Sequence, residues 1–258
     1  MSHYTGMIVL PAAPTKDTLE STLTDLLAPY SEEIEVEEYK DYIEQGDRWP
    51  RDFAAKEAGI DPTDDQSVAQ FMAERYPTDK YGADEKGLYR WSTYNPKSKW
   101  DWWAIGGRWK GYFQVRSGAT SFLGHSGAFG NEAAGPHPAD VVRKGDIDID
   151  AMIAAAAKAR GEGWDKAQEM ESEMRAFIYE IGANDTRETY IARGSTIERV
   201  LQPYAVLADG EWREPGQMGW FGADDSTDDS QQDYSEWFAE FWSNLSDDTW
   251  LAVVDLHI

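Results

Sequence analysis

The sequence predicts an α+β fold, and an antiparallel, ferredoxin-like sheet is the arrangement we expect for it. Residues 4–10 form an apolar run that stops at Pro11, and residues 249–257 form a second apolar run. Stretches with apolar residues at helical spacing lie between these two runs and other strand-like segments. We therefore expect the first and last strands to lie side by side, with helices inserted between the strands of one sheet.

The first half of the chain contains two predicted helices. Residues 15–27 have leucines at helical spacing and end before Pro29, and residues 63–76 have an apolar stripe formed by Val68, Phe71, Met72 and Tyr76. The polar stretch 31–62 between them is expected to be irregular, with short pieces of helix. Three strand-like segments follow, at residues 87–93, 100–105 and 108–115. Gly106-Gly107 joins the last two and predicts a hairpin or a bulge.

The second half is expected to contain a helical insert. Residues 117–138 are rich in Gly, Ser and Ala, and are either a flap over the preceding strands or an ordinary long loop. The insert covers about 150–200, and a hairpin around Asp209-Gly210 and an amphipathic helix at 231–245 follow it. The whole chain, 1–258, is expected to be a single domain.

Composition excludes several classes of protein. The absence of Cys excludes a disulfide scaffold, a thiolate zinc site and a cysteine nucleophile, and it suits a reducing cytosol. The longest apolar runs are too short to span a membrane, and the N-terminus lacks the pattern of a signal peptide. A net charge of −24 argues against binding to polymeric nucleic acid.

The charge is unevenly distributed, which points to a candidate binding site. Seven Lys and Arg and one Asp give residues 86–116 a charge of +6, so the other residues carry −30. Five of the 12 Trp lie in this basic segment. Cations bind phosphates and aromatic rings stack on bases, so the pattern predicts a small phosphorylated nucleotide as ligand. The expected ligand-binding residues are Asn95, Lys97, Lys99, Trp100, Asp101, Trp103, Arg108 and Trp109, with Trp220 from the glycine-rich turn 216–222.

Residues 86–116 have two competing interpretations, a binding site and a core strand. Asp101 is expected to hold the Arg108 guanidinium, which would then present a fork of donors to an anion. The competing interpretation is a Trp-rich core strand whose cations balance the acidic remainder of the chain.

Two further groups of residues could perform chemistry. If the terminal strands pair, His3 comes near Asp255 and His257, and these three could bind a divalent metal or supply a general acid and base. The alternative is that they are polar residues at strand ends. Asp146, Asp148 and Asp150 could coordinate Mg²⁺, or could cap the helix that follows them.

Several segments together resemble a family of uncharacterised proteins from tailed phages. The likeness lies in the opening Met1-Ser2-His3-Tyr4, the block at 95–109 (NPKSKWDWWAIGGRW), the RKGDID segment at 143–148 and the ending VVDLHI at 253–258. Family members have Phe where this chain has Tyr4 and Cys where it has Leu256. The resemblance implies an accessory protein that acts in the host cytosol, but it does not imply any particular activity.

These observations lead to three hypotheses. The first is a phage counter-defence protein that sequesters a small anionic signalling nucleotide, cyclic or of the ADP-ribose type, without a cofactor. The second is a phosphoesterase that degrades such a nucleotide, using a divalent metal or the histidines. The third is an acidic DNA mimic that inhibits a host defence protein. The sequence does not determine the oligomeric state.

Overall fold

The computed structural model describes residues 2–44, 48–127, 133 and 135–258. Two compact units share the chain: one comprises residues 1–29 and 99–258, and the other residues 30–98. The sequence predicts one domain, whereas the contacts divide the chain after Pro29 and again before Lys99.

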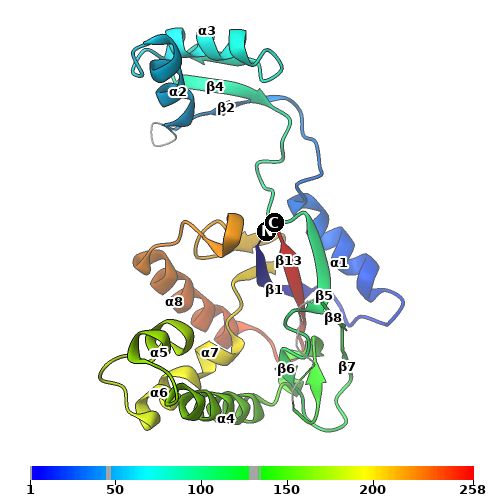
Figure 1. Ribbon diagram of the computed structural model, residues 1–258. Coiled ribbons are helices and arrows are strands. Elements are labelled where there is room, and N and C mark those ends of the chain that lie inside the picture. Colours follow the sequence, from blue (N-terminus) through cyan, green and yellow to red (C-terminus); the bar gives the residue numbers. More distant parts are fainter. Residues whose placement is uncertain (1, 45–47, 128–132, 134) are drawn as a thin grey trace. The chain divides into compact units, whose positions relative to one another are not determined.

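The terminal strands lie at the centre of the larger unit. Strand β1 (His3–Leu10) pairs antiparallel with β13 (Trp250–His257), from His3 opposite His257 to Leu10 opposite Trp250. On its other edge β1 pairs parallel with β11 (Ala205–Ala208). The α+β class and the adjacent terminal strands are thereby confirmed (Figure 1).

Shorter strands extend this sheet on both sides. Strand β12 (Glu211–Arg213) pairs with β11, and the turn between them has Asp209 and Gly210 at φ 51° and 76°, as the predicted hairpin requires. The second edge of β13 pairs with β10 (Val141–Arg143) and, nearer its C-terminal end, with β5 (Trp102–Gly107). Strands β7 (Ser121–Phe122) and β8 (His125–Ser126) complete a sheet of eight strands within the described residues, more than a βαββαβ unit contains.

The hairpin expected across Gly106-Gly107 is not formed. Strand β6 (Phe113–Gln114) pairs with β9 (Pro138–Ala139), while β5 pairs with β13 and β8. Gly106 and Gly107 have φ of 75° and 55°, and they turn the chain away from β5 so that the Trp109 N–H donates to the Gly106 carbonyl.

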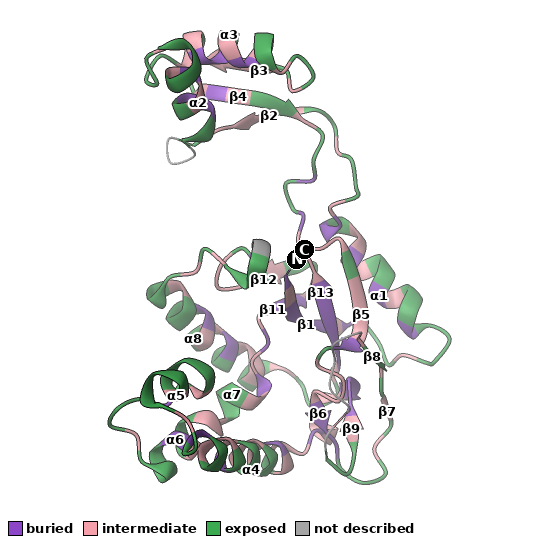
Figure 2. Cartoon of the chain, viewed as in Figure 1, coloured by how far each residue is buried: buried purple, intermediate pink, exposed green. Residues whose placement is uncertain are grey.

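Opposite faces of the large sheet are covered by different helices. Helix α1 (Leu19–Leu27) lies on one side and α8 (Asp228–Asn244) on the other (Figure 1). Met7 and Val253, which are opposite each other in the β1–β13 pair, pack in a core with Phe238 of α8. Figure 2 shows the buried residues concentrated in these central strands. His3, Asp255 and His257 alternate in phase with Met7 and Val253, so they lie where this core face reaches the strand ends.

The helical insert predicted at 150–200 is confirmed. It consists of α4 (Ile149–Ala167), α5 (Ser172–Tyr179), α6 (Arg187–Gly194) and α7 (Ile197–Leu201). Ala167, Ile181 and Tyr190 form a small core between these helices. Among the described residues, no helix combines the length and apolar character needed to cross a membrane.

The smaller unit is a three-stranded antiparallel sheet packed on two helices. Its order is β2 (Tyr39–Tyr42), β4 (Gly87–Ser92), β3 (Tyr81–Asp84). Helices α2 (Trp49–Ala58) and α3 (Asp65–Arg75) bury Ala54, Val68 and Met72 against Leu88. The stretch 31–62, expected to be largely irregular, therefore contains a strand and a full helix.

Short 3-10 helices lie at Ala28–Tyr30, Lys144–Asp146 and Trp220–Gly222.

Candidate functional site

The two terminal histidines lie side by side. His3 and His257 are directly opposite each other in the β1–β13 pair, so their side chains point to the same face of the sheet. Their ring centroids are 4.7 Å apart and their planes are inclined by 69°. The side chains are 17% and 13% exposed, so both rings are accessible from solvent while most of their surface is held by protein.

Each imidazole is bound by its own carboxylate. His3 Nδ1 lies 2.8 Å from Asp255 Oδ1, and His257 Nδ1 lies 2.5 Å from Asp101 Oδ1. The Asp101 backbone N–H also donates to the His257 carbonyl, which fixes the second pair. A carboxylate on Nδ1 keeps the proton on that nitrogen and leaves Nε2 for chemistry. In the part of the chain that the structure describes, neither Nε2 has a hydrogen-bond partner.

Asp255 is held by the turn that contains the two glycines. Its side chain is fully buried, and its Oδ2 accepts a hydrogen bond of 2.9 Å from the Arg108 backbone N–H. A Cβ on Gly107 would lie 2.3 Å from the Asp255 Cβ, and the φ of 55° at Gly107 disfavours any other residue. The glycine therefore allows the backbone to approach closely enough to orient the carboxylate that holds His3.

A second buried carboxylate, Asp140, organises the loops around this turn. Its Oδ1 accepts from the N–H groups of Gly111 (2.7 Å) and Tyr112 (3.1 Å), and its Oδ2 from that of Gly124 (2.8 Å). Burial raises the pKa of Asp140 even though these three donors favour its ionised form. Asp140 is not among the residues predicted from the sequence, although it is a lone acid inside the apolar run 139–142.

Several of the expected ligand-binding residues are engaged within the chain. Lys99 Nζ lies 2.6 Å from Glu214 Oε1, and the side chains are only 21% and 9% exposed. Trp100 Nε1 donates to the Leu27 carbonyl at 3.1 Å. The Asp101 carboxylate, expected to hold Arg108, is the partner of His257.

The remaining expected residues are spread over the structure. Arg108 is exposed, whereas Trp103 and Trp109 are partly buried. Asn95 and Lys97 belong to the smaller unit, where the Asn95 amide donates to the Ser31 carbonyl and its oxygen accepts from the Lys97 N–H. The basic segment is thus divided between the two units. The side chain of Trp220 lies outside the described residues.

The three alternating aspartates have separate structural roles. Asp146 forms an ion pair with Arg143 at 3.0 Å, and Asp148 caps α4 by accepting from the Ala151 N–H at 2.9 Å. Asp150 lies in the first turn of the same helix, where a carboxylate is favoured. Within residues 2–44, 48–127, 133 and 135–258, no group of three or more His, Asp or Glu side chains has the arrangement of a metal site.

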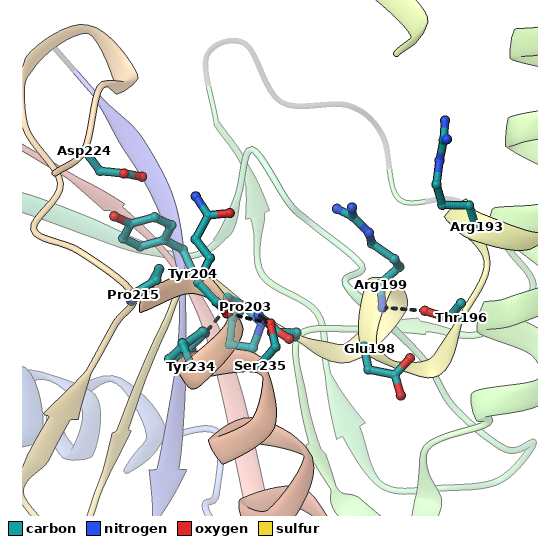
Figure 3. A pocket seen from close by; sticks show the side chains of 12 residues that line it. Arg193, Thr196, Glu198, Arg199, Pro203, Tyr204, Pro215, Asp224, Tyr234 and Ser235 are labelled. Atoms are coloured by element: carbon teal, nitrogen blue, oxygen red, sulfur yellow. Dashed lines mark hydrogen bonds between the residues drawn. The ribbon is translucent and has the colours of Figure 1, made fainter. Parts of the chain in front are cut away.

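A cavity of about 540 Å³ lies between the helical insert and α8 (Figure 3). Arg193, Arg199, Glu198 and Asp224 line it, so its charges balance. None of the expected site residues that the structure describes lines this cavity. His3 and His257 lie outside this cavity.

No family model, curated protein or solved structure matches the chain. The interpretation of the site therefore depends on its own geometry. Trp102, which was not among the expected residues, adjoins it: Trp102 is opposite His257 in the β13–β5 pair, and its ring contacts that of His3 edge-on at 6.3 Å.

Proposed function

We propose that this protein hydrolyses a phosphodiester bond in a small nucleotide by general acid–base catalysis, with His3 and His257 as the two catalytic groups. One observation carries the proposal: two imidazoles lie 4.7 Å apart, each with a carboxylate on Nδ1 and with Nε2 available. Displacement at phosphorus needs one group to remove a proton and another to donate one, and imidazole does both near neutral pH.

The reaction follows from these two roles. One imidazole, neutral at Nε2, removes a proton from a water molecule as the water oxygen forms its bond to phosphorus. The bond from phosphorus to the leaving oxygen breaks, and the second imidazole, protonated at Nε2, donates its proton to that oxygen. The products are a phosphomonoester and an alcohol, and proton exchange with solvent restores both rings. Asp255 and Asp101 orient the rings and stabilise the imidazolium forms.

Charge and aromatic character define the substrate class. Trp102 is 48% exposed beside His3 and offers a surface on which a base can stack. The net charge of −24 disfavours a long polyanion, which supports a small nucleotide as substrate.

The resemblance to tailed-phage proteins supplies a biological setting for this activity. Hydrolysis of a signalling nucleotide in the cytosol of an infected cell would be a counter-defence function. Sequestration of the same ligand without turnover remains the second hypothesis. The Lys99–Glu214 pair weakens it, because one of its principal expected anion contacts is already neutralised.

The test is to incubate the protein with adenylyl-3′,5′-adenosine and with cyclic diadenylate, in buffer containing EDTA and ¹⁸O-labelled water. Mass spectrometry should find a phosphomonoester carrying one ¹⁸O atom. His137→Ala is the matched control, because His137 is exposed and belongs to neither pair, and it should retain full activity. Recovery of both nucleotides intact from the wild-type protein would contradict hydrolysis, and tight binding without turnover would favour sequestration.

A further inference from the structure

Helix α5 of the helical insert presents an apolar stripe to solvent. Met174, Phe177 and Ile178 have the i, i+3, i+4 spacing that places side chains on one face of a helix. Their exposed fractions are 49%, 85% and 49%, and none of the eight residues of α5 is buried (Figure 2). Because the helices of a globular domain turn such a stripe toward its core, an exposed stripe indicates a surface that binds a partner.

Other residues hold α5 on the insert. Tyr179 packs with Ala167 and Tyr190 in the small core between these helices. At the C-terminal end of α5, Glu180 has a φ of 54° and a ψ of 33°, a left-handed conformation that glutamate seldom adopts. The Arg193 side chain secures this turn by donating to the Glu180 carbonyl at 2.8 Å. The helix and its apolar stripe are therefore ordered before any partner binds.

The charged residues around the stripe are mostly acidic. Residues 169–180 contain four glutamates and one arginine, so this segment carries a net charge of −3. The arginine, Arg175, donates from Nη1 to Gln168 Oε1 at 3.2 Å. All four glutamates are exposed, namely Glu169, Glu171, Glu173 and Glu180. An apolar stripe bordered by carboxylates is complementary to a helix with one apolar and one basic face.

We propose that α5 is a docking site for a basic amphipathic helix of another protein. The apolar face of that helix covers Phe177 and its two neighbours in the stripe, and its Lys and Arg side chains pair with the surrounding glutamates. The net charge of −24 on the whole chain speeds the approach of a cationic partner. A second copy of this chain would bring a second acidic border against the first, which like-charge repulsion disfavours.

The test measures, by calorimetry on the full chain, the binding of a synthetic helical peptide of about four turns with Leu on one face and Lys on the other. A peptide of the same composition in scrambled order keeps the charge and removes the apolar face. The helical peptide should bind at least about tenfold more tightly than the scrambled peptide. Phe177→Ala should remove most of this difference, because it removes the most exposed side chain of the stripe.

Matched variants distinguish the stripe and its border from the rest of the surface. Leu123→Ala is the control for Phe177→Ala, because Leu123 is 45% exposed between β7 and β8, and it should leave the affinity unchanged. Replacing Glu171 and Glu173 together by Gln should weaken binding of the helical peptide. The same change at Glu236 and Glu240, which are exposed on α8, should have a smaller effect because these charges lie elsewhere.

Equal affinity for the two peptides, or an unchanged preference in Phe177→Ala, would overturn the inference. Sedimentation equilibrium of the protein alone and flotation with phosphatidylcholine vesicles test the other occupants. A dimer or vesicle binding that Phe177→Ala abolishes would overturn the inference in favour of a second copy or a membrane. Turnover of adenylyl-3′,5′-adenosine should be the same in Phe177→Ala as in the wild type, so the hydrolase proposal succeeds or fails separately.

Discussion

His3 Nδ1 lies 2.8 Å from Oδ1 of Asp255, a carboxylate that has no exposed surface and receives its second hydrogen bond from the Arg108 backbone. Asp101, the partner of His257, is 33% exposed. The two histidine–carboxylate pairs therefore differ in how easily water could replace the carboxylate.

This difference predicts unequal effects of removing the two charges. Asp255→Asn should lower kcat by about 10²–10⁴-fold, because no water can take the place of the buried carboxylate on His3. Asp101→Asn should have the smaller effect, on the order of tenfold or less, since solvent reaches this site. Steady-state kinetics measure both, and thermal denaturation checks that each variant folds. Equal losses in the two variants would show that burial does not distinguish the pairs.

Gly107 should be essential for activity as well as for the turn. In Gly107→Ala the new methyl group would collide with Asp255, which would move the carboxylate away from His3 and reduce turnover at least about 100-fold. Gly118→Ala is the matched control: its φ of 85° imposes comparable backbone strain, but nothing lies within 4 Å of the new Cβ. Both variants should lose about 1 kcal/mol of stability from backbone strain, Gly107→Ala should lose more because of the collision with Asp255, and only Gly107→Ala should lose activity. An active Gly107→Ala enzyme would contradict the proposed role of the turn.

The rate of hydrolysis should depend on pH in a bell-shaped manner. Turnover needs one neutral and one protonated imidazole, so kcat/KM should fall on both sides of an optimum. Measuring kcat/KM across the pH range in which the enzyme stays folded provides the test. A rate that rises steadily with pH, without a descending limb, would indicate hydroxide attack without a general acid.

The acid stability of the smaller unit should depend on Asp84. Hydrogen bonds from Lys40, the Lys86 backbone and Tyr42 lower the pKa of Asp84 to about 2, with the Lys40 contact, at 2.6 Å, contributing most. Because the folded-state pKa lies below the ordinary value near 4, the pair stabilises the unit above about pH 4. That contribution is lost as the pH falls toward 2. A double-mutant cycle of Lys40→Met and Asp84→Asn, followed by urea denaturation, should give a coupling free energy at pH 7 that shrinks at pH 2. Coupling that is independent of pH would contradict this assignment.

Asp148 should affect stability alone. Its carboxylate caps α4, so Asp148→Ala should lower the free energy of unfolding by about 1 kcal/mol and leave turnover unchanged. Urea denaturation and kinetics of the same preparation measure the two quantities. Loss of turnover without loss of stability would indicate that Asp146, Asp148 and Asp150 bind a metal ion.

The part of the site formed by the terminal strands could be predicted from the sequence. Apolar runs at both ends predict adjacent strands, and strand alternation then places His3, Asp255 and His257 on one face. Capping by Asp148 was also predictable as one of two alternatives, because it depends on residues within one helical turn.

Contacts between distant residues could not be predicted in this way. Asp101 and His257 are 156 positions apart, and Lys99 and Glu214 are 115 apart. No local pattern shows that Lys99 is neutralised or that Asp101 binds a histidine rather than Arg108. The division of the chain at residues 29 and 98 has the same cause, because it reflects which segments pack together and not the composition of either boundary.

The most direct test of the central claim is to measure kcat/KM for a nucleoside phosphodiester with His3→Ala, His257→Ala and the double variant. If the two imidazoles act together as acid and base, each single substitution should lower kcat/KM about 10³-fold or more, and the double variant should be little worse than either. Turnover in either single variant within a few-fold of the wild-type value would contradict the account.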